Sequence, residues 1–268
     1  MIRVELRKLL VRPRTWSSLL LLCLLPLVVA LFLRVSHLAP RPGTGPAFLS
    51  AVLANGQLFP AAALGIVLPL FLPVAVAVIA GDSVAGEAAG GTLRYLLVRP
   101  VGRTRLLVAK LVAVLAYLLL AVTLVAVTAY VIGTSLFGST AAPTSLSGTV
   151  LTPVDLTRRT VLVVLYVAWS MVGVAAVALL LSTLTDSSLG AALGALAALV
   201  LSEVLVTLDA AGSVQPYLPT RYWLSWVDLF RDPILWHDVQ RGVAVQGVYV
   251  VVLLGVAWAG FVTKDITS

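Results

Sequence analysis

The sequence predicts an all-α integral membrane protein with six transmembrane helices, and two observations lead to this fold class. First, 60% of the 268 residues are hydrophobic and only 11% are charged, whereas soluble domains carry about 25% charged residues. Second, the apolar residues gather in six blocks about as long as the roughly 20 residues that a helix needs to cross a membrane. We therefore expect a single transmembrane domain over residues 1–268, with spans at 16–35, 58–80, 106–132, 160–181, 189–208 and 243–262.

The basic residues indicate how these spans are oriented. Six spans leave both termini on one side of the membrane, and that side carries eleven of the 18 Lys and Arg residues. Because Lys and Arg concentrate in cytoplasmic loops, we expect both termini in the cytoplasm of a multi-pass plasma-membrane protein. The formal net charge of +7 then reflects topology. Nucleic-acid binding would need a basic face on a folded domain, and we expect no such domain.

Residues 1–15 precede the first span and have an amphipathic pattern. Ile2, Leu6, Leu9 and Leu10 form an apolar stripe when the segment is helical. We expect a helix lying on the cytoplasmic surface, in contact with anionic membrane lipid. The candidate interface residues of this helix are Arg3, Glu5, Arg7 and Lys8.

Residues 81–105, between the second and third spans, form the most polar and irregular stretch of the chain. Gly91 can end the preceding helix, and Thr92 can cap a new one. That short helix should stop before Pro100, because proline disfavours helical geometry in the residue preceding it. Its leucines, Leu93, Leu96 and Leu97, share one face. Such a stub either lies on lipid or inserts into a groove of a partner protein.

The segment 209–242, before the last span, is rich in aromatic residues. Trp223, Val227, Phe230 and Ile234 follow the spacing of one face of an α-helix. We expect a short helix in the outer interface, either as part of an aromatic belt or as a gate above a pathway. The candidate gate residues are Trp223, Trp226 and Phe230.

Two charged residues fall inside predicted spans. Glu203 lies within about two turns of the outer end of its span, where it either serves a pathway or simply reaches interfacial water or Arg158 and Arg159. Lys110 lies one turn inside the cytoplasmic end of its span, so we expect its side chain to extend back to the water interface.

Small residues and prolines mark two of the spans. In the second span Pro60, Pro69 and Pro73 should kink or break the helix, which suits a moving part but is also common in membrane helices. In the fifth span Gly190 and Gly194 are four residues apart and favour close helix packing, either within the chain or in a dimer.

The segment between the second and third spans resembles the corresponding segment in permease subunits of ABC transporters of the type-2 exporter family. That family has a Glu, then Gly-Thr-Leu, a Leu-Leu pair, a Pro, a basic turn and a Lys entering the next span. The opening ELRKLLVRPRTW and the ending FVTKDITS also resemble the two ends of such permeases. The matching positions here are Glu87, Gly91-Thr92-Leu93, Leu96-Leu97, Pro100, Arg103 and Lys110.

The resemblance implies a coupling helix that docks on a separate ATPase subunit. The implied partners are two ABC ATP-binding subunits, which would hold ATP and Mg²⁺, and a second permease subunit in a homodimer or heterodimer. The chain itself lacks a P-loop, because none of its three lysines follows a glycine, so we expect no ATPase activity, cofactor or metal site in it. The implied coupling residues are Glu87, Gly91, Thr92, Leu93, Arg94, Leu96, Leu97, Arg99, Pro100 and Arg103.

The residues alone also allow two other classes of protein to be considered. A secondary transporter or channel would work without ATP, but inverted repeats should place matching breaks in both halves, and the prolines of the second span have no counterpart in spans four to six. A membrane-embedded enzyme would need a catalytic cluster. Only His37 and His237 are present, and both lie in predicted external loops.

Overall fold

The computed structural model describes residues 1–36, 52–53, 55–91, 102–138, 142–208 and 211–263. Six helices are long and apolar enough to cross a membrane, which confirms the all-α class with six candidate spans. They are α2 (Pro13–Ser36), α5 (Phe71–Ala89), α7 (Arg103–Phe137), α8 (Pro153–Leu184), α9 (Ser188–Thr207) and α10 (Trp236–Thr263).

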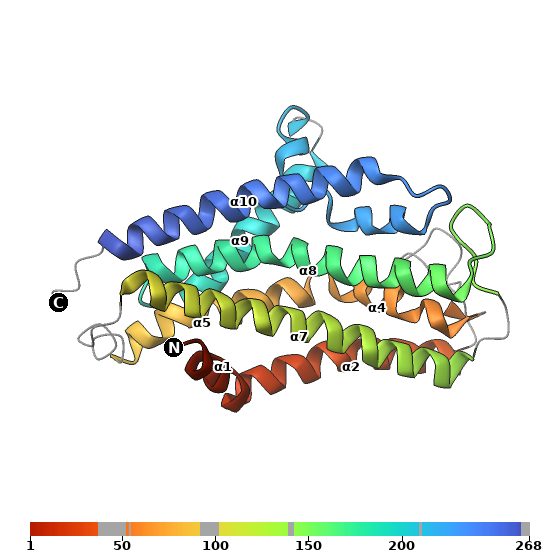
Figure 1. The fold of residues 1–268 in the computed structure, drawn as a ribbon, viewed down its shortest axis with the longest axis horizontal. Coiled ribbons are helices and arrows are strands. Elements are labelled where there is room, and N and C mark those ends of the chain that lie inside the picture. Colours follow the sequence, from red (N-terminus) through yellow and green to blue (C-terminus); the bar gives the residue numbers. More distant parts are fainter. Residues whose placement is uncertain (37–51, 54, 92–101, 139–141, 209–210, 264–268) are drawn as a thin grey trace.

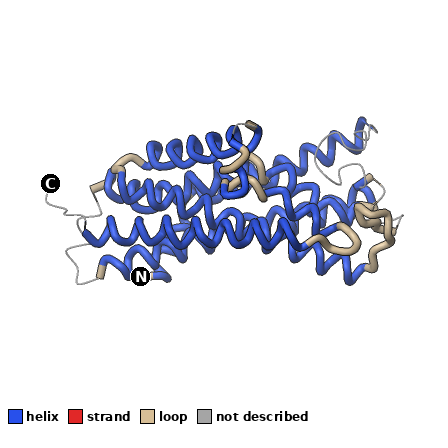
Figure 2. Tube along the Cα trace, turned by 90° about the horizontal axis from the view of Figure 1, so that it is seen from above, coloured by secondary structure: helices blue, strands red, loops and turns tan. Residues whose placement is uncertain are grey.

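The long helices form an elongated bundle (Figures 1 and 2), and α2, α7, α8 and α10 run along its long axis (Figure 1). Within it α5 packs on α8 and α9, α10 packs on α8, and α2 packs on α7. The N-terminus and the last turn of α10 lie at the same end of the bundle (Figure 1). This end, called here the terminal end, also holds the last turns of α5 and the first turns of α7. An even number of crossings produces this arrangement.

The second span differs from its predicted form. In place of one helix over 58–80, the 3₁₀ turn η1 (Gly56–Leu58) leads into α4 (Phe59–Val67), and α5 begins only at Phe71. The break includes Pro69, and Pro73 follows it, so two backbone donors are missing where a continuous helix would need them. Leu70 has φ −134° and ψ −56°, outside helical geometry.

The far end of α5 also differs from the prediction. The helix continues to Ala89, well inside the segment predicted to be a coupling loop over 81–105. Hydropathy placed the end of the span before Asp82 because charged residues begin there. Asp82 and Glu87 instead keep their helical backbone and find ion-pair partners on neighbouring helices. Helix and apolar span therefore end at different residues.

The third and fourth long helices are longer than a membrane requires. α7 has 35 residues and α8 has 32, so each is about 50 Å long at 1.5 Å per residue. The hydrocarbon core of a bilayer is only about 30 Å thick. Both helices therefore extend beyond it.

The small residues of α9 pack inside the chain. Ala191, Ala192 and Ala195 are buried, and α9 lies against α5. The approach is closest at Gly81 of α5, where an added Cβ would lie 3.0 Å from the backbone nitrogen of Ala192. The alanines of this small-residue pattern therefore pack inside the chain, whereas Gly190 is exposed.

Candidate functional site

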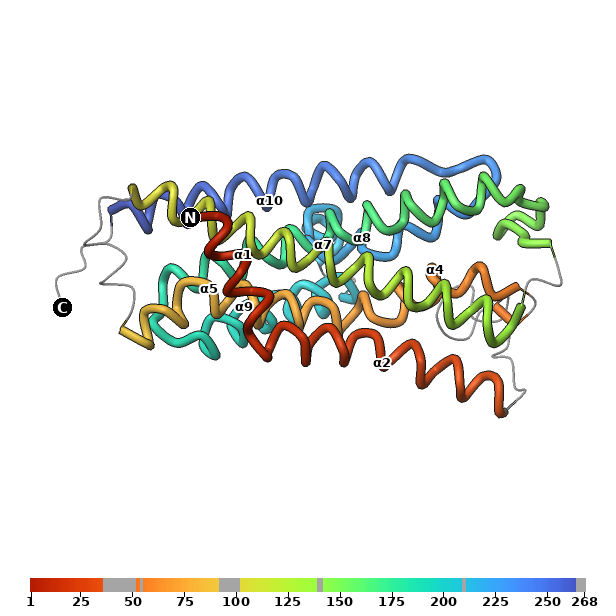
Figure 3. The backbone as a smooth tube through the Cα atoms, turned by 60° about the horizontal axis from the view of Figure 1, so that its bottom comes forward, coloured from red at the N-terminus to blue at the C-terminus, as the bar shows by residue number. Residues whose placement is uncertain are grey.

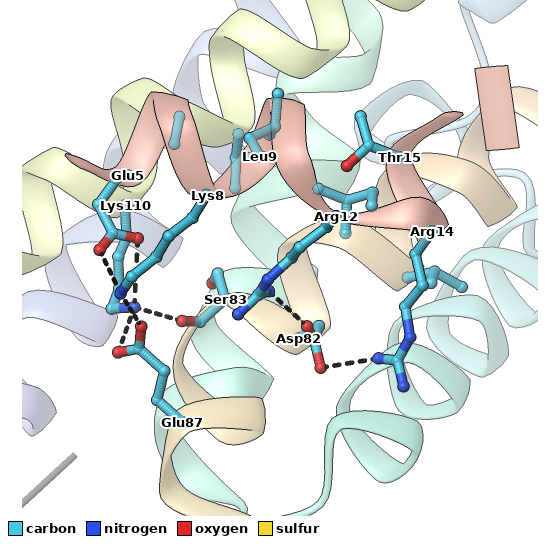
Figure 4. A pocket seen from close by; sticks show the side chains of 14 residues that line it. Glu5, Lys8, Leu9, Arg12, Arg14, Thr15, Asp82, Ser83, Glu87 and Lys110 are labelled. Atoms are coloured by element: carbon cyan, nitrogen blue, oxygen red, sulfur yellow. Dashed lines mark hydrogen bonds and ion pairs between the residues drawn. The ribbon is translucent and has the colours of Figure 1, made fainter. Parts of the chain in front are cut away.

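Four charged side chains from three helices meet at the terminal end of the bundle (Figure 4). Helix α1 (Ile2–Val11) crosses this end before α2 begins (Figure 3) and packs on α7. It contributes Glu5 and Lys8, while α5 contributes Glu87 and α7 contributes Lys110. Lys8 Nζ lies 2.8 Å from Glu87 Oε1 and 3.0 Å from Glu5 Oε1. Lys110 Nζ lies 2.6 Å from Glu87 Oε2 and 3.7 Å from Glu5 Oε2. We call these four residues the charge cluster.

Lys110 is the most enclosed member of the charge cluster. Only 1% of its side chain and 6% of that of Glu87 are exposed. Its ammonium group also donates a hydrogen bond to the carbonyl oxygen of Ser83, at 2.5 Å. Burying an isolated charge would be costly, but two carboxylates and two ammonium groups leave the cluster neutral. The prediction that Lys110 extends to the water interface is wrong, because its charge is satisfied inside the protein.

Lys8 lies at the open side of the charge cluster, with 37% of its side chain exposed. Partial burial acts to lower the pKa of Lys8, but its hydrogen bonds to Glu87 and Glu5 outweigh burial and raise that pKa above 10.5. Lys8 is therefore an ammonium ion at neutral pH. The two carboxylates that hold it come from different helices, so Lys8 ties α1 to α5.

A second set of ion pairs lies beside the charge cluster. Asp82 of α5 accepts hydrogen bonds from Arg12 at 2.8 Å and from Arg14 at 3.2 Å (Figure 4). Arg12 and Arg14 lie at the junction of α1 and α2. This junction is therefore attached to α5 through Asp82.

The orientation of α1 divides its predicted interface residues into two groups. Glu5 and Lys8 face α5 and α7, with Leu9 buried beside them. Arg3 and Arg7 are exposed. The apolar stripe predicted to contact lipid is only partly used in packing, since Ile2 remains 44% exposed.

The charge cluster joins the two ends of the segment that carries the family resemblance, through the ion pair between Glu87 and Lys110. Glu87 is the first and Lys110 the last of the positions that carry the resemblance. Gly91 has φ +66°, a left-handed conformation that glycine adopts most readily. Arg103 donates to the carbonyl oxygen of Val262, at 2.8 Å. The other predicted coupling residues lie outside the described residues: Thr92, Leu93, Arg94, Leu96, Leu97, Arg99 and Pro100.

A serine that sequence reasoning missed attaches α8 to α5 near this site. The hydroxyl of Ser182 donates to the carbonyl oxygen of Gly81 at 2.7 Å and accepts from the backbone nitrogens of Val84 and Ala85. Ser182 is buried. A serine near the end of a span carries no local signal of such a role, because its partners are about 100 residues away in sequence.

The predicted gate residues belong to a 3₁₀ helix, η4 (Trp223–Phe230), rather than to an α-helix. With three residues per turn, Trp223, Trp226 and Leu229 share a face, and all three are buried together with Phe230. The buried face of this segment therefore contains Trp226 and Leu229 in place of the predicted Val227 and Ile234. The hydroxyl of Tyr166 on α8 donates to the carbonyl oxygen of Tyr222 at 2.6 Å and helps to hold η4 against the bundle.

Glu203 lies on α9 with an exposed side chain. The two arginines proposed as its partners do not pair with it in the described part of the chain. Arg159 donates to the carbonyl oxygens of Leu229 and Arg231, and its guanidinium lies 3.9 Å from Asp232. Arg158 is exposed.

The residues that the structure describes contain no group of three or more His, Cys, Asp or Glu side chains that could hold a metal ion.

From residue 27 to residue 267 the sequence matches the family described as "Protein of unknown function (DUF2705)". The chain therefore belongs to this family. No curated protein matches the sequence.

Proposed function

We propose that this chain is the permease subunit of an ATP-driven ABC exporter, which forms the translocation pathway and couples to a separate ATP-binding subunit through residues 92–101. The observation that carries the proposal is the ion pair between Glu87 and Lys110. It joins the last turns of α5 to the first turns of α7, at the base of the segment whose sequence resembles a coupling helix. A loop that only connected two spans would not need this buried contact.

The contacts around that base suit the transmission of force. A displacement of residues 92–101 would act on α5 and α7 together, because Glu87 and Lys110 join them. Helix α1 would follow through Lys8, and α10 through the bond between Arg103 and Val262. Nucleotide binding in the partner would then shift the population between inward-open and outward-open arrangements of the helices.

The proposed complex contains two ATP-binding subunits, which hold ATP and Mg²⁺, and a second permease subunit, identical or different. The chain itself has no ATPase motif, because a P-loop requires a Gly-Lys pair and no lysine in the sequence follows a glycine, so ATP hydrolysis is assigned to the partner. The coupling segment and both termini lie on the cytoplasmic side of the plasma membrane, as the distribution of basic residues favours.

A secondary transporter or channel is the second candidate function. The break between α4 and α5, with Glu203 close to it, has the form of the discontinuous helices that line binding sites in such proteins. That function would require transport without ATP, and it assigns no role to the leucines of residues 92–101.

Co-purification tests the proposed function. The tagged chain would be isolated from its native membranes in mild detergent, as wild type and as Leu96→Asp. Leu146→Asp is the matched control, because Leu146 is exposed in the loop that contacts η4. We expect a P-loop ATPase with the wild type and the control and none with Leu96→Asp, while all three chains elute as monodisperse species. Absence of an ATPase from the wild type, under conditions that preserve a known membrane complex, would contradict the proposal and favour the second candidate.

A further inference from the structure

A pocket of about 280 Å³ lies where the second span is broken. The residues of the break, Pro69 and Leu70, form one wall together with Pro73. Helix α9 forms the opposite wall, and Trp223 of η4 also lines the pocket. Most of the lining is apolar, so the pocket suits an apolar group.

The pocket is an open hollow on the side of the bundle, because Leu70, Val200 and Glu203 are exposed, and it lies well away from the terminal end. Asp82 belongs to the ion pairs at the terminal end, and Pro73 lies nine residues earlier on the same helix. At 1.5 Å per residue this separation is about 14 Å along the axis, which is close to half the roughly 30 Å of a bilayer's hydrocarbon core. The pocket is therefore near mid-membrane rather than at the outer end that the sequence suggested for Glu203.

Glu203 supplies the charge of this pocket and is the only ionisable side chain among the described residues that line it. The other polar side chains there already have partners. Thr207 donates to the carbonyl oxygen of Val204 at 2.7 Å, and Thr220 shares a hydrogen bond with Ser202 at 2.8 Å. The Glu203 carboxylate makes no ion pair with any residue that the structure describes. An acid at this depth is costly unless something compensates its charge.

Trp223 lines the pocket but keeps its polar atom buried. The indole nitrogen of Trp223 is buried and has no hydrogen-bond acceptor among the described residues, and the whole side chain is only 6% exposed. Buried donors are normally bonded. A molecule in the pocket does not reach this buried nitrogen, so Trp223 contributes its apolar ring to the lining.

The geometry points to a binding site for an amphipathic cation, with Glu203 as the counter-ion and the apolar walls of α5 and α9 around the rest of the ligand. Within the hydrocarbon layer of a membrane the attraction between Glu203 and a cation is stronger than in water, because the effective dielectric constant there is low. The volume suits a cationic head with its adjoining apolar part. That such a molecule is the cargo rests on the proposed function, whereas its binding to the chain does not.

The test measures binding to the chain alone, without any ATPase, in lipid nanodiscs. The probes are tetraphenylphosphonium and tetraphenylborate, which have nearly the same shape and opposite charge, and empty nanodiscs correct for lipid partitioning. Each probe is measured alone, and we expect tetraphenylphosphonium to bind the wild type and tetraphenylborate to bind no more than it binds empty nanodiscs. Glu203→Gln should weaken binding about tenfold and Glu203→Asp less, while Asp238→Asn, an exposed acid outside the pocket, should bind as the wild type does.

Equal affinity of the wild type and Glu203→Gln for tetraphenylphosphonium would overturn the inference, as would no binding above that of empty nanodiscs. Equal affinity of the wild type for tetraphenylborate, measured alone, would also contradict it. These results are independent of co-purification. If the chain binds the cation but no ATPase co-purifies, the binding site is supported and the ABC function is contradicted. If an ATPase co-purifies but the cation does not bind, the ABC function is supported and the binding site is contradicted.

Discussion

Replacing Lys110 by methionine tests the charge cluster most severely. The substitution keeps the length of the apolar stem and removes the ammonium group, so that Glu5, Glu87 and Lys8 remain with an excess negative charge. Only 6% of the Glu87 side chain is exposed. Water therefore cannot readily replace the lost partner. We expect Lys110→Met to lower the stability of the folded protein substantially.

The magnitude follows from the distance and the burial. At 2.6 Å and an effective dielectric constant of 20, the attraction between Lys110 and Glu87 is about 6 kcal/mol. Desolvation of both charges offsets part of it, and removal of one member of a buried pair costs about 3–5 kcal/mol. For a protein of this size that loss corresponds to a melting temperature lower by about 10 °C.

Thermal melting in detergent, followed by the fraction that stays monodisperse on size exclusion, provides the assay. Lys8→Met is the matched control. Because 37% of Lys8 is exposed, its loss should cost only about 1 kcal/mol. The double variant Glu87→Gln, Lys110→Met leaves the neutral pair of Glu5 and Lys8. Its loss of stability should therefore be smaller than the sum of the losses of the two single variants. A melting temperature of Lys110→Met equal to that of the wild type, or strict additivity in the double variant, would refute the reasoning.

Three further changes probe the other end of the bundle and use the same melting assay. Gly133→Val should destabilise by about 3 kcal/mol, because the backbone carbonyl of Gly56 occupies the space of an added side chain; an unchanged melt would contradict this close contact. Trp226→Ala should cost about 3–5 kcal/mol, because the buried indole packs beside Gly65; a cost below 1 kcal/mol would mean that η4 is loosely held. Arg159→Met removes the donor to the carbonyl oxygens of Leu229, in η4, and Arg231, directly after it, and should cost about 1–3 kcal/mol; proteolysis at the end of η4 should also be faster, and equal rates would contradict the role.

Hydropathy predicted the number of membrane-crossing helices because it measures transfer from water, which does not depend on which helix becomes the neighbour. It predicted helix ends less well for the same reason. The last turns of α5 contain Asp82 and Glu87, which local sequence assigns to a loop. Only the folded chain brings Arg12 and Lys110 to them and makes a helix possible there.

The site was predictable in part. Glu87 and the N-terminal helix were singled out from the sequence, but their direct contact through Lys8 was not, because 79 residues separate the two members of the pair. The prediction for the aromatic segment before α10 was wrong because it assumed the periodicity of an α-helix. Its side chains were placed by the 3.6-residue turn of an α-helix, whereas η4 turns every three residues and buries Trp226 in place of Val227.

Photo-crosslinking from position 96 tests the central claim most directly, because it asks what residues 92–101 touch in the native membrane. A benzoylphenylalanine in place of Leu96 should crosslink to a protein that contains a P-loop, and the same group in place of Leu146 should not. Crosslinks from position 96 to lipid or to this chain alone, in membranes where the ATPase candidates are present, would contradict a coupling role for the segment.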